Sequence, residues 1–127
     1  MTDAYKRGLE NLREGRFFEA HEELELVWRA AAPGERDFYQ GLVHVAVAWY
    51  QAGRGNRVGC ERQLAKAQRR LGPYASAHRG VDVASLLAQV DGAAETVATG
   101  SLELPPEEEI DPTQQDRRHV PNLRAHG

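Results

Sequence analysis

Residues 17–28 read Phe-Phe-Glu-Ala-His-Glu-Glu-Leu-Glu-Leu-Val-Trp, and we expect the rest of the chain to be organised around them. The apolar side chains of this stretch recur at the three- and four-residue spacing of one helix face. The stripe that they form consists of Phe17, Leu24, Trp28 and Ala31. It predicts a helix over 17–31 that ends at the turn-forming pair Pro33-Gly34. His21 falls on the same face, so we expect its imidazole to be buried.

Four further stretches show helical periodicity and are separated by glycine, proline or capping residues. The predicted helices cover residues 4–14, 35–52, 57–71 and 83–98. Asn56 and Asp82 precede two of them and can accept hydrogen bonds from the first helical turn. Gly15 is well placed to end the first helix in a left-handed conformation. Residues 74–81 are expected to form a loop.

The predicted helix over 35–52 is apolar on nearly every side between Phe38 and Tyr50. A helix of this kind is buried on several sides. It is either the central helix of a bundle or half of the interface of a homo-oligomer. Short turns and the lack of a credible strand pair predict an all-α fold. We expect a single-domain bundle of about five helices built from antiparallel helix hairpins.

Charge is unevenly distributed along the chain, whose net charge is −3. Residues 103–127 hold six acids and three arginines, which leaves 13 acids and 13 bases in residues 1–102. The balanced segment argues against binding to nucleic acid. We therefore expect a bundle domain at 1–102, followed by an extended acidic and polar tail at 103–127.

Two features of the sequence, the lack of a long apolar run and the single cysteine, favour a cytoplasmic location. The chain has no apolar run of 18 or more residues, so no membrane span is expected. The single cysteine, Cys60, excludes an internal disulfide and indicates a reducing compartment. We expect it to be an inert apolar residue.

The acids beside His21 form the first candidate site. His21 and Glu25 lie one helical turn apart, and imidazole and carboxylate together suit zinc, iron or manganese. Glu22 would then be the catalytic base on a metal-bound water, with His44 as a further ligand. The simpler interpretation is that His21 is a buried histidine paired within the fold, because unpaired buried polar groups are costly.

Gln40 and His44 form a second polar pair, on the otherwise apolar helix over 35–52. If this pair meets His21 and Glu25, the bundle contains a polar site between the second and third helices. Otherwise His44 faces solvent or a partner subunit. Three aromatic residues are expected in the core, and they are Trp28, Trp49 and Tyr50. The candidate ligand-binding residues are His21, Glu22, Glu25, Trp28, Gln40 and His44, and no cofactor is expected.

Three motifs carry a family resemblance. They are Phe18-Glu19-Ala20-His21-Glu22-x-x-Glu25-x-x-Trp28, Gln40-Gly41-Leu42 and Arg54-Gly55-Asn56-x-x-Gly59. In this order they resemble the prokaryotic domain-of-unknown-function 309 family over about residues 5–98. The resemblance implies a small all-α bacterial protein without an established activity. Tyr50 stands where the family pattern has a histidine, which disfavours a metal site.

These observations favour a ligand-binding or protein-interaction module with a polar His/Glu cluster between the second and third helices. The alternative is a metal-dependent hydrolase that uses His21, Glu22 and Glu25.

Overall fold

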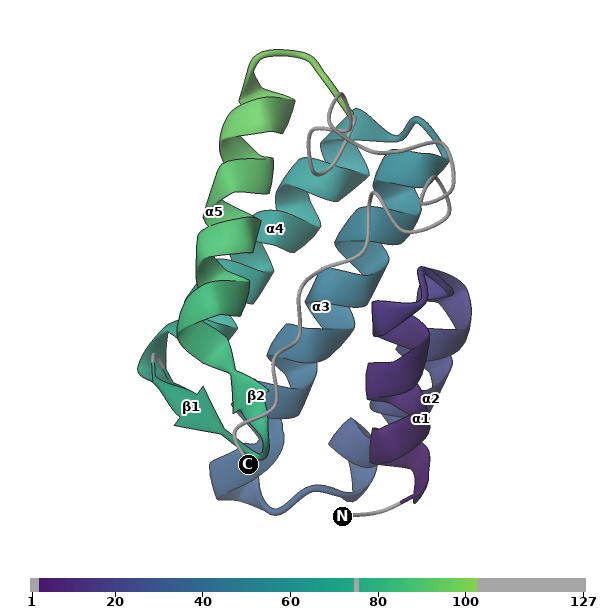
Figure 1. Ribbon diagram of the computed structural model, residues 1–127, viewed down its shortest axis with the longest axis vertical. Coiled ribbons are helices and arrows are strands. Elements are labelled where there is room, and N and C mark those ends of the chain that lie inside the picture. The colour runs from purple at the N-terminus through teal and green to yellow at the C-terminus, as the bar shows by residue number, and fades with distance from the viewer. Residues whose placement is uncertain (1–2, 75, 103–127) are drawn as a thin grey trace.

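The computed structural model describes residues 3–74 and 76–102, which form five α-helices and one small hairpin (Figure 1). The helices are α1 (Asp3–Arg13), α2 (Phe17–Ala30), α3 (Arg36–Gly53), α4 (Arg57–Leu71) and α5 (Val83–Ala98). The predicted all-α bundle is confirmed, and each helix boundary lies within one residue of the expected position. The predicted tail at 103–127 lies outside the described residues.

Two helical hairpins, α1–α2 and α3–α4, have nearly identical turns. Gly15 and Gly55 both adopt the left-handed conformation, with φ of 80° and 77°. The same backbone hydrogen bond closes each turn, from Arg16 N to Asn11 O at 2.8 Å and from Asn56 N to Gln51 O at 2.9 Å. The two hairpins are therefore closed by equivalent turns.

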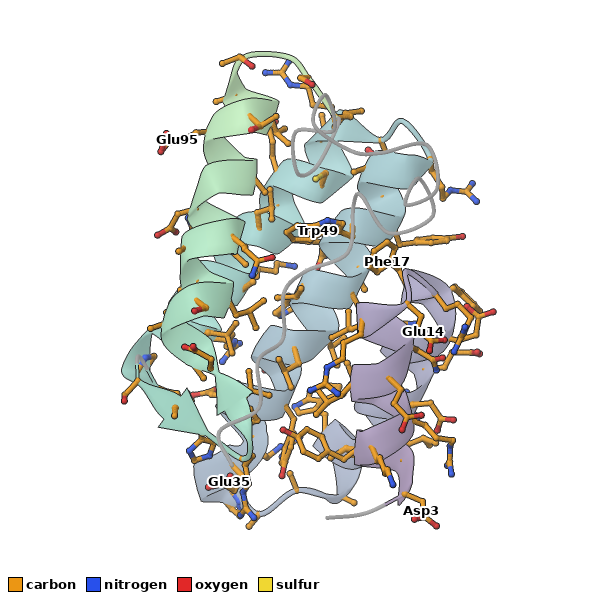
Figure 2. The ribbon with its side chains drawn as sticks, viewed as in Figure 1. Asp3, Glu14, Phe17, Glu35, Trp49 and Glu95 are labelled. Carbon is orange, nitrogen blue, oxygen red and sulfur yellow. The ribbon has the colours of Figure 1, made fainter. Side chains whose placement is uncertain are left out.

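Helix α3 lies at the centre of the bundle, with α1 and α2 on one side and α4 and α5 on the other (Figure 1). Its apolar side chains are largely buried, and Trp49 is only 3% exposed in the interior (Figure 2). Trp28 and Tyr50 were also expected in the core, but both are only partly buried. The apolar character of α3 is accounted for within one chain. It therefore gives no reason to expect a partner subunit on this helix.

A short 3-10 helix, η2 (Gly72–Tyr74), leads into the expected loop at 74–81. The loop region also holds two short antiparallel strands, which the sequence did not predict. They are β1 (Ala77–His78) and β2 (Val81–Asp82). Arg79 and Gly80, which connect them, have φ of 49° and 78°. Positive φ at both positions is the signature of a type I′ turn, where Asn-Gly is the usual sequence. Arginine in place of asparagine concealed the turn.

A further 3-10 helix, η1 (Pro33–Glu35), joins α2 to α3. The hairpin lies at the same end of the bundle as η1 (Figure 1). Among the described helices, none combines the length and the hydropathy that crossing a membrane requires.

Candidate functional site

His21 lies at the edge of the buried face of α2 rather than inside the bundle. Its side chain is 29% exposed, so the expectation of a buried imidazole was wrong. The fully buried side chains of α2 are Ala20 and Leu24. His21 follows Ala20 by about 100° around the helix, which carries its ring toward the surface.

The carboxylate of Glu25 holds two partners on its own helix. Its Oε2 lies 2.7 Å from His21 Nε2, and its Oε1 accepts a hydrogen bond from Arg29 Nη2 at 2.5 Å. His21, Glu25 and Arg29 line a shallow groove of about 320 Å³ together with Glu22 and Leu26. The predicted pairing of His21 with Glu25 is therefore present, and Arg29 extends it into a three-residue cluster.

This geometry does not suit a metal ion. A cation that binds Glu25 must compete with the guanidinium of Arg29, which already occupies Oε1. Zinc sites are normally built from at least three protein ligands. Across residues 3–74 and 76–102, no group of three or more His, Cys, Asp or Glu side chains is placed to hold a metal.

His44 belongs to the interface between α3 and α4. Its Nδ1 lies 2.7 Å from Gln63 Oε1, and burial lowers the pKa of the imidazole. Neighbouring Gly41 packs against Leu71 of α4, so this side of α3 faces α4. In the described residues, no hydrogen bond or ion pair joins Gln40 or His44 to His21 or Glu25. The structure therefore does not assemble the internal site expected between α2 and α3.

Trp28 lies near the end of α2, packed against the edge of the core. The guanidinium of Arg36 lies 5.6 Å from the centroid of its ring. This arrangement is a cation–π contact. Trp28 therefore connects the end of α2 to the start of α3, and it does not line the groove beside His21.

The outer face of α2 carries features that the sequence analysis did not select. Phe18 and Leu26 are 47% and 56% exposed. The Phe18 ring contacts both His21 and Tyr50, with centroid distances of 5.9 and 5.6 Å. Leu26 lies opposite the apolar stripe and Phe18 lies on its flank, about 100° from Phe17. Helical periodicity could therefore have identified both as apolar residues outside the buried face.

The described chain is a small all-α protein made of two helical hairpins and a fifth helix that covers α4. Residues 5–63 match the family model described as Domain of unknown function (DUF309). This match bears out the predicted family resemblance over residues 5–63. The match ends within α4, although the resemblance was expected to extend to about residue 98. Among curated proteins, none matches the chain.

Proposed function

We propose that the protein is an interaction module that binds a basic, partly apolar segment of another protein on the outer face of α2. The observation that carries the proposal is the exposure of Phe18 and Leu26 on this face, at 47% and 56%. Eight residues of helix place them about 80° apart, on one side of α2. Single exposed apolar residues are common. Two large ones on the solvent face of one helix provide anchors for a partner.

Charge favours a basic partner. Glu19 and Glu22 are exposed between these anchors, and neither has an ion pair within the described chain. By contrast, the carboxylate of Glu25 is paired with Arg29 and lies against His21. An acidic strip between two apolar anchors is complementary to lysine or arginine that alternates with apolar residues. Complementary charge contributes mainly to specificity and to the rate of association.

A second copy of the chain also presents a surface of this chemistry. The outer face of α4 carries Val58, which is 56% exposed, beside exposed basic residues. These basic residues are Arg62, Lys66 and Arg69. Self-association between α2 and α4 is therefore a competing form of the same recognition, and the experiment must separate it from binding to another protein.

The test places a photo-reactive amino acid at position 22 of the full chain, in cells that produce the protein naturally. The matched control carries it at position 95, because Glu95 is also exposed and points outward from α5 (Figure 2). We expect an adduct from position 22 and not from position 95. The mass of the adduct distinguishes a second copy from another protein. Peptide mapping locates the cross-linked segment.

A second variant, Phe18→Ser combined with Glu22→Lys, should prevent binding while leaving the helical content unchanged, because neither side chain is buried. The proposal fails if positions 22 and 95 give the same adducts or none. It also fails if the segment cross-linked at position 22 lacks lysine and arginine. A metal-dependent hydrolase is not proposed, because no geometric observation favours it.

A further inference from the structure

A second groove, of about 330 Å³, lies where the end of α2 meets α1, α3 and the turn of the hairpin. Its walls are mostly apolar, with Leu26, Val27 and the alanines at 30–32 on one side. Glu35, Tyr39 and Arg79 supply its polar groups, and Figure 2 shows Glu35 at this end of the bundle. The volume is at the lower limit for ligand pockets, so it suits a small molecule.

The polar side of the groove has unused hydrogen-bonding capacity. Glu35 Oε1 accepts from Arg79 Nε at 3.0 Å and lies 2.8 Å from His78 Nε2. Within the described residues, Glu35 Oε2 and the two terminal nitrogens of Arg79 have no hydrogen-bond partner. The two side chains therefore offer a free carboxylate oxygen and two free guanidinium NH2 groups at the groove.

Tyr39 adds a third polar group. Its ring is packed against Tyr5 and Phe38, while its hydroxyl has no hydrogen-bond partner in the described part of the chain. Burial raises the pKa of this phenol, so the hydroxyl remains protonated and can donate a hydrogen bond. The rigid ring holds this donor in a fixed position beside the groove.

The backbone at Arg79 provides an independent indication. Its φ of 49° lies in the left-handed region, where asparagine or glycine is much easier to accommodate than arginine. Tyr5 fixes this turn, because its hydroxyl donates to Arg79 O at 2.7 Å. Strained residues of this kind are concentrated at functional sites. Here the strained position directs a guanidinium to the polar side of the groove.

We propose that this groove binds a small zwitterion with an apolar group, namely an apolar α-amino acid such as leucine. The ligand carboxylate lies against the guanidinium of Arg79 and the hydroxyl of Tyr39. The ligand ammonium lies against Glu35 Oε2, and the apolar side chain lies against Leu26 and Val27. The proposal is independent of partner binding at the outer face of α2, although Leu26 borders both surfaces.

The groove carries a negative carboxylate and a positive guanidinium, so its ligand must carry a positive and a negative group to match them. A simple carboxylate would meet the negative charge of Glu35 as well as Arg79, and a simple amine would meet Arg79 as well as Glu35. A molecule with both groups satisfies both residues, so the arrangement discriminates against either singly charged analogue. The partial exposure of Arg79 and Glu35, at 53% and 24%, limits the strength of each ion pair.

The test is a titration of the full chain with leucine, followed by NMR chemical shifts and calorimetry. The comparison ligands are 4-methylpentanoate, which lacks the ammonium, 3-methylbutylamine, which lacks the carboxylate, and glycine, which lacks the apolar group. We expect leucine to bind with a dissociation constant of about 0.1–1 mM. Each comparison ligand should bind at least about fivefold more weakly.

Arg79→Asn is the decisive variant. Asparagine suits the type I′ turn, so this change removes the guanidinium without disturbing the hairpin. We expect leucine binding to weaken about tenfold in Arg79→Asn, and to weaken also in Tyr39→Phe. The matched control is Arg69→Asn, which removes an exposed arginine from α4 and should leave binding unchanged.

Three results would overturn the proposal. They are the absence of saturable shifts with leucine up to about 10 mM, equal binding of leucine and 4-methylpentanoate, and unchanged leucine binding in Arg79→Asn. The variants at positions 18 and 22 should leave leucine binding intact. Loss of the cross-linked partner together with retained leucine binding would therefore separate the two proposals.

Discussion

Gly41 of α3 lies so close to Leu71 of α4 that a β-carbon at Gly41 would come within 2.6 Å of the Leu71 side chain. The same β-carbon would lie 3.3 Å from Arg70 Cβ. Alanine at position 41 would therefore push α3 and α4 apart. We expect Gly41→Ala to lower the free energy of unfolding by about 1–3 kcal/mol, as overpacking does in other cores. Urea denaturation measures this change.

Gly92 supplies the matched control, because it lies inside α5 and a β-carbon there would meet nothing within 4 Å. Gly92→Ala should raise the free energy of unfolding by about 0.5–1 kcal/mol, the gain in helix propensity alone. If both alanine variants were stabilising, the close contact between α3 and α4 would not be as tight as the structure indicates.

The helices were predictable because their signals are local. The Asn56 side chain accepts from Gly59 N at 2.9 Å, and Asp82 accepts from Ser85 N at 3.0 Å, as their positions before α4 and α5 predicted. These capping bonds join residues three positions apart, so the sequence contains them directly. Apolar periodicity then determined which segments were helical.

The candidate site was less predictable because it depends on how each helix is rotated against its neighbours. The apolar stripe of α2 is broad, and the sequence does not say which edge of it is covered. The structure covers Ala20 and Leu24 and leaves His21 at the surface. The groove near Glu35 and Arg79 was missed for a related reason. These residues are 44 positions apart and meet only through the tertiary fold.

His21→Ala is expected to be nearly neutral for stability. The pair with Glu25 is an i, i+4 contact between side chains that are 29% and 26% exposed, and such pairs contribute about 0.3–0.5 kcal/mol. Leu24→Ala, at a fully buried position of the same helix, should cost about 2–5 kcal/mol. Thermal or urea unfolding of both variants provides the comparison. A loss of more than about 1 kcal/mol for His21→Ala would show that the histidine has a structural role.

Tyr5→Phe should loosen the hairpin. The Tyr5 hydroxyl donates to Arg79 O at 2.7 Å in a partly buried setting, so its removal leaves the carbonyl unpaired and costs about 0.5–1.5 kcal/mol. Tyr74→Phe is the control, because the bond from its hydroxyl to Gly34 O is longer, at 3.1 Å, and exposed. Hydrogen exchange at the amides of 77–82 should accelerate more in Tyr5→Phe than in Tyr74→Phe. Equal exchange rates would remove Tyr5 as the anchor of the turn.

His44 should make the bundle sensitive to acid. Burial, together with the positive charges of Lys66, Arg70 and Arg69, lowers the pKa of its imidazole despite the hydrogen bond that Gln63 Oε1 accepts from it. Below pH of about 6.5, the unfolded chain therefore binds a proton at His44 that the folded chain does not yet bind. Stability attributable to this group is present above that pH and is lost as the pH falls toward the lowered pKa.

Two variants isolate the contribution of His44. His44→Gln removes the titrating group, so the free energy of unfolding should decline less than in the natural chain between about pH 7 and pH 5. Gln63→Glu places a carboxylate where an oxygen lies 2.7 Å from His44 Nδ1, which raises the pKa of the imidazole and should also reduce the decline. Urea titrations at both pH values measure the difference. If His44→Gln lost as much stability on acidification as the natural chain, the lowered pKa would not be the cause. The remaining histidines and carboxylates, which are common to both chains, would then account for the acid sensitivity.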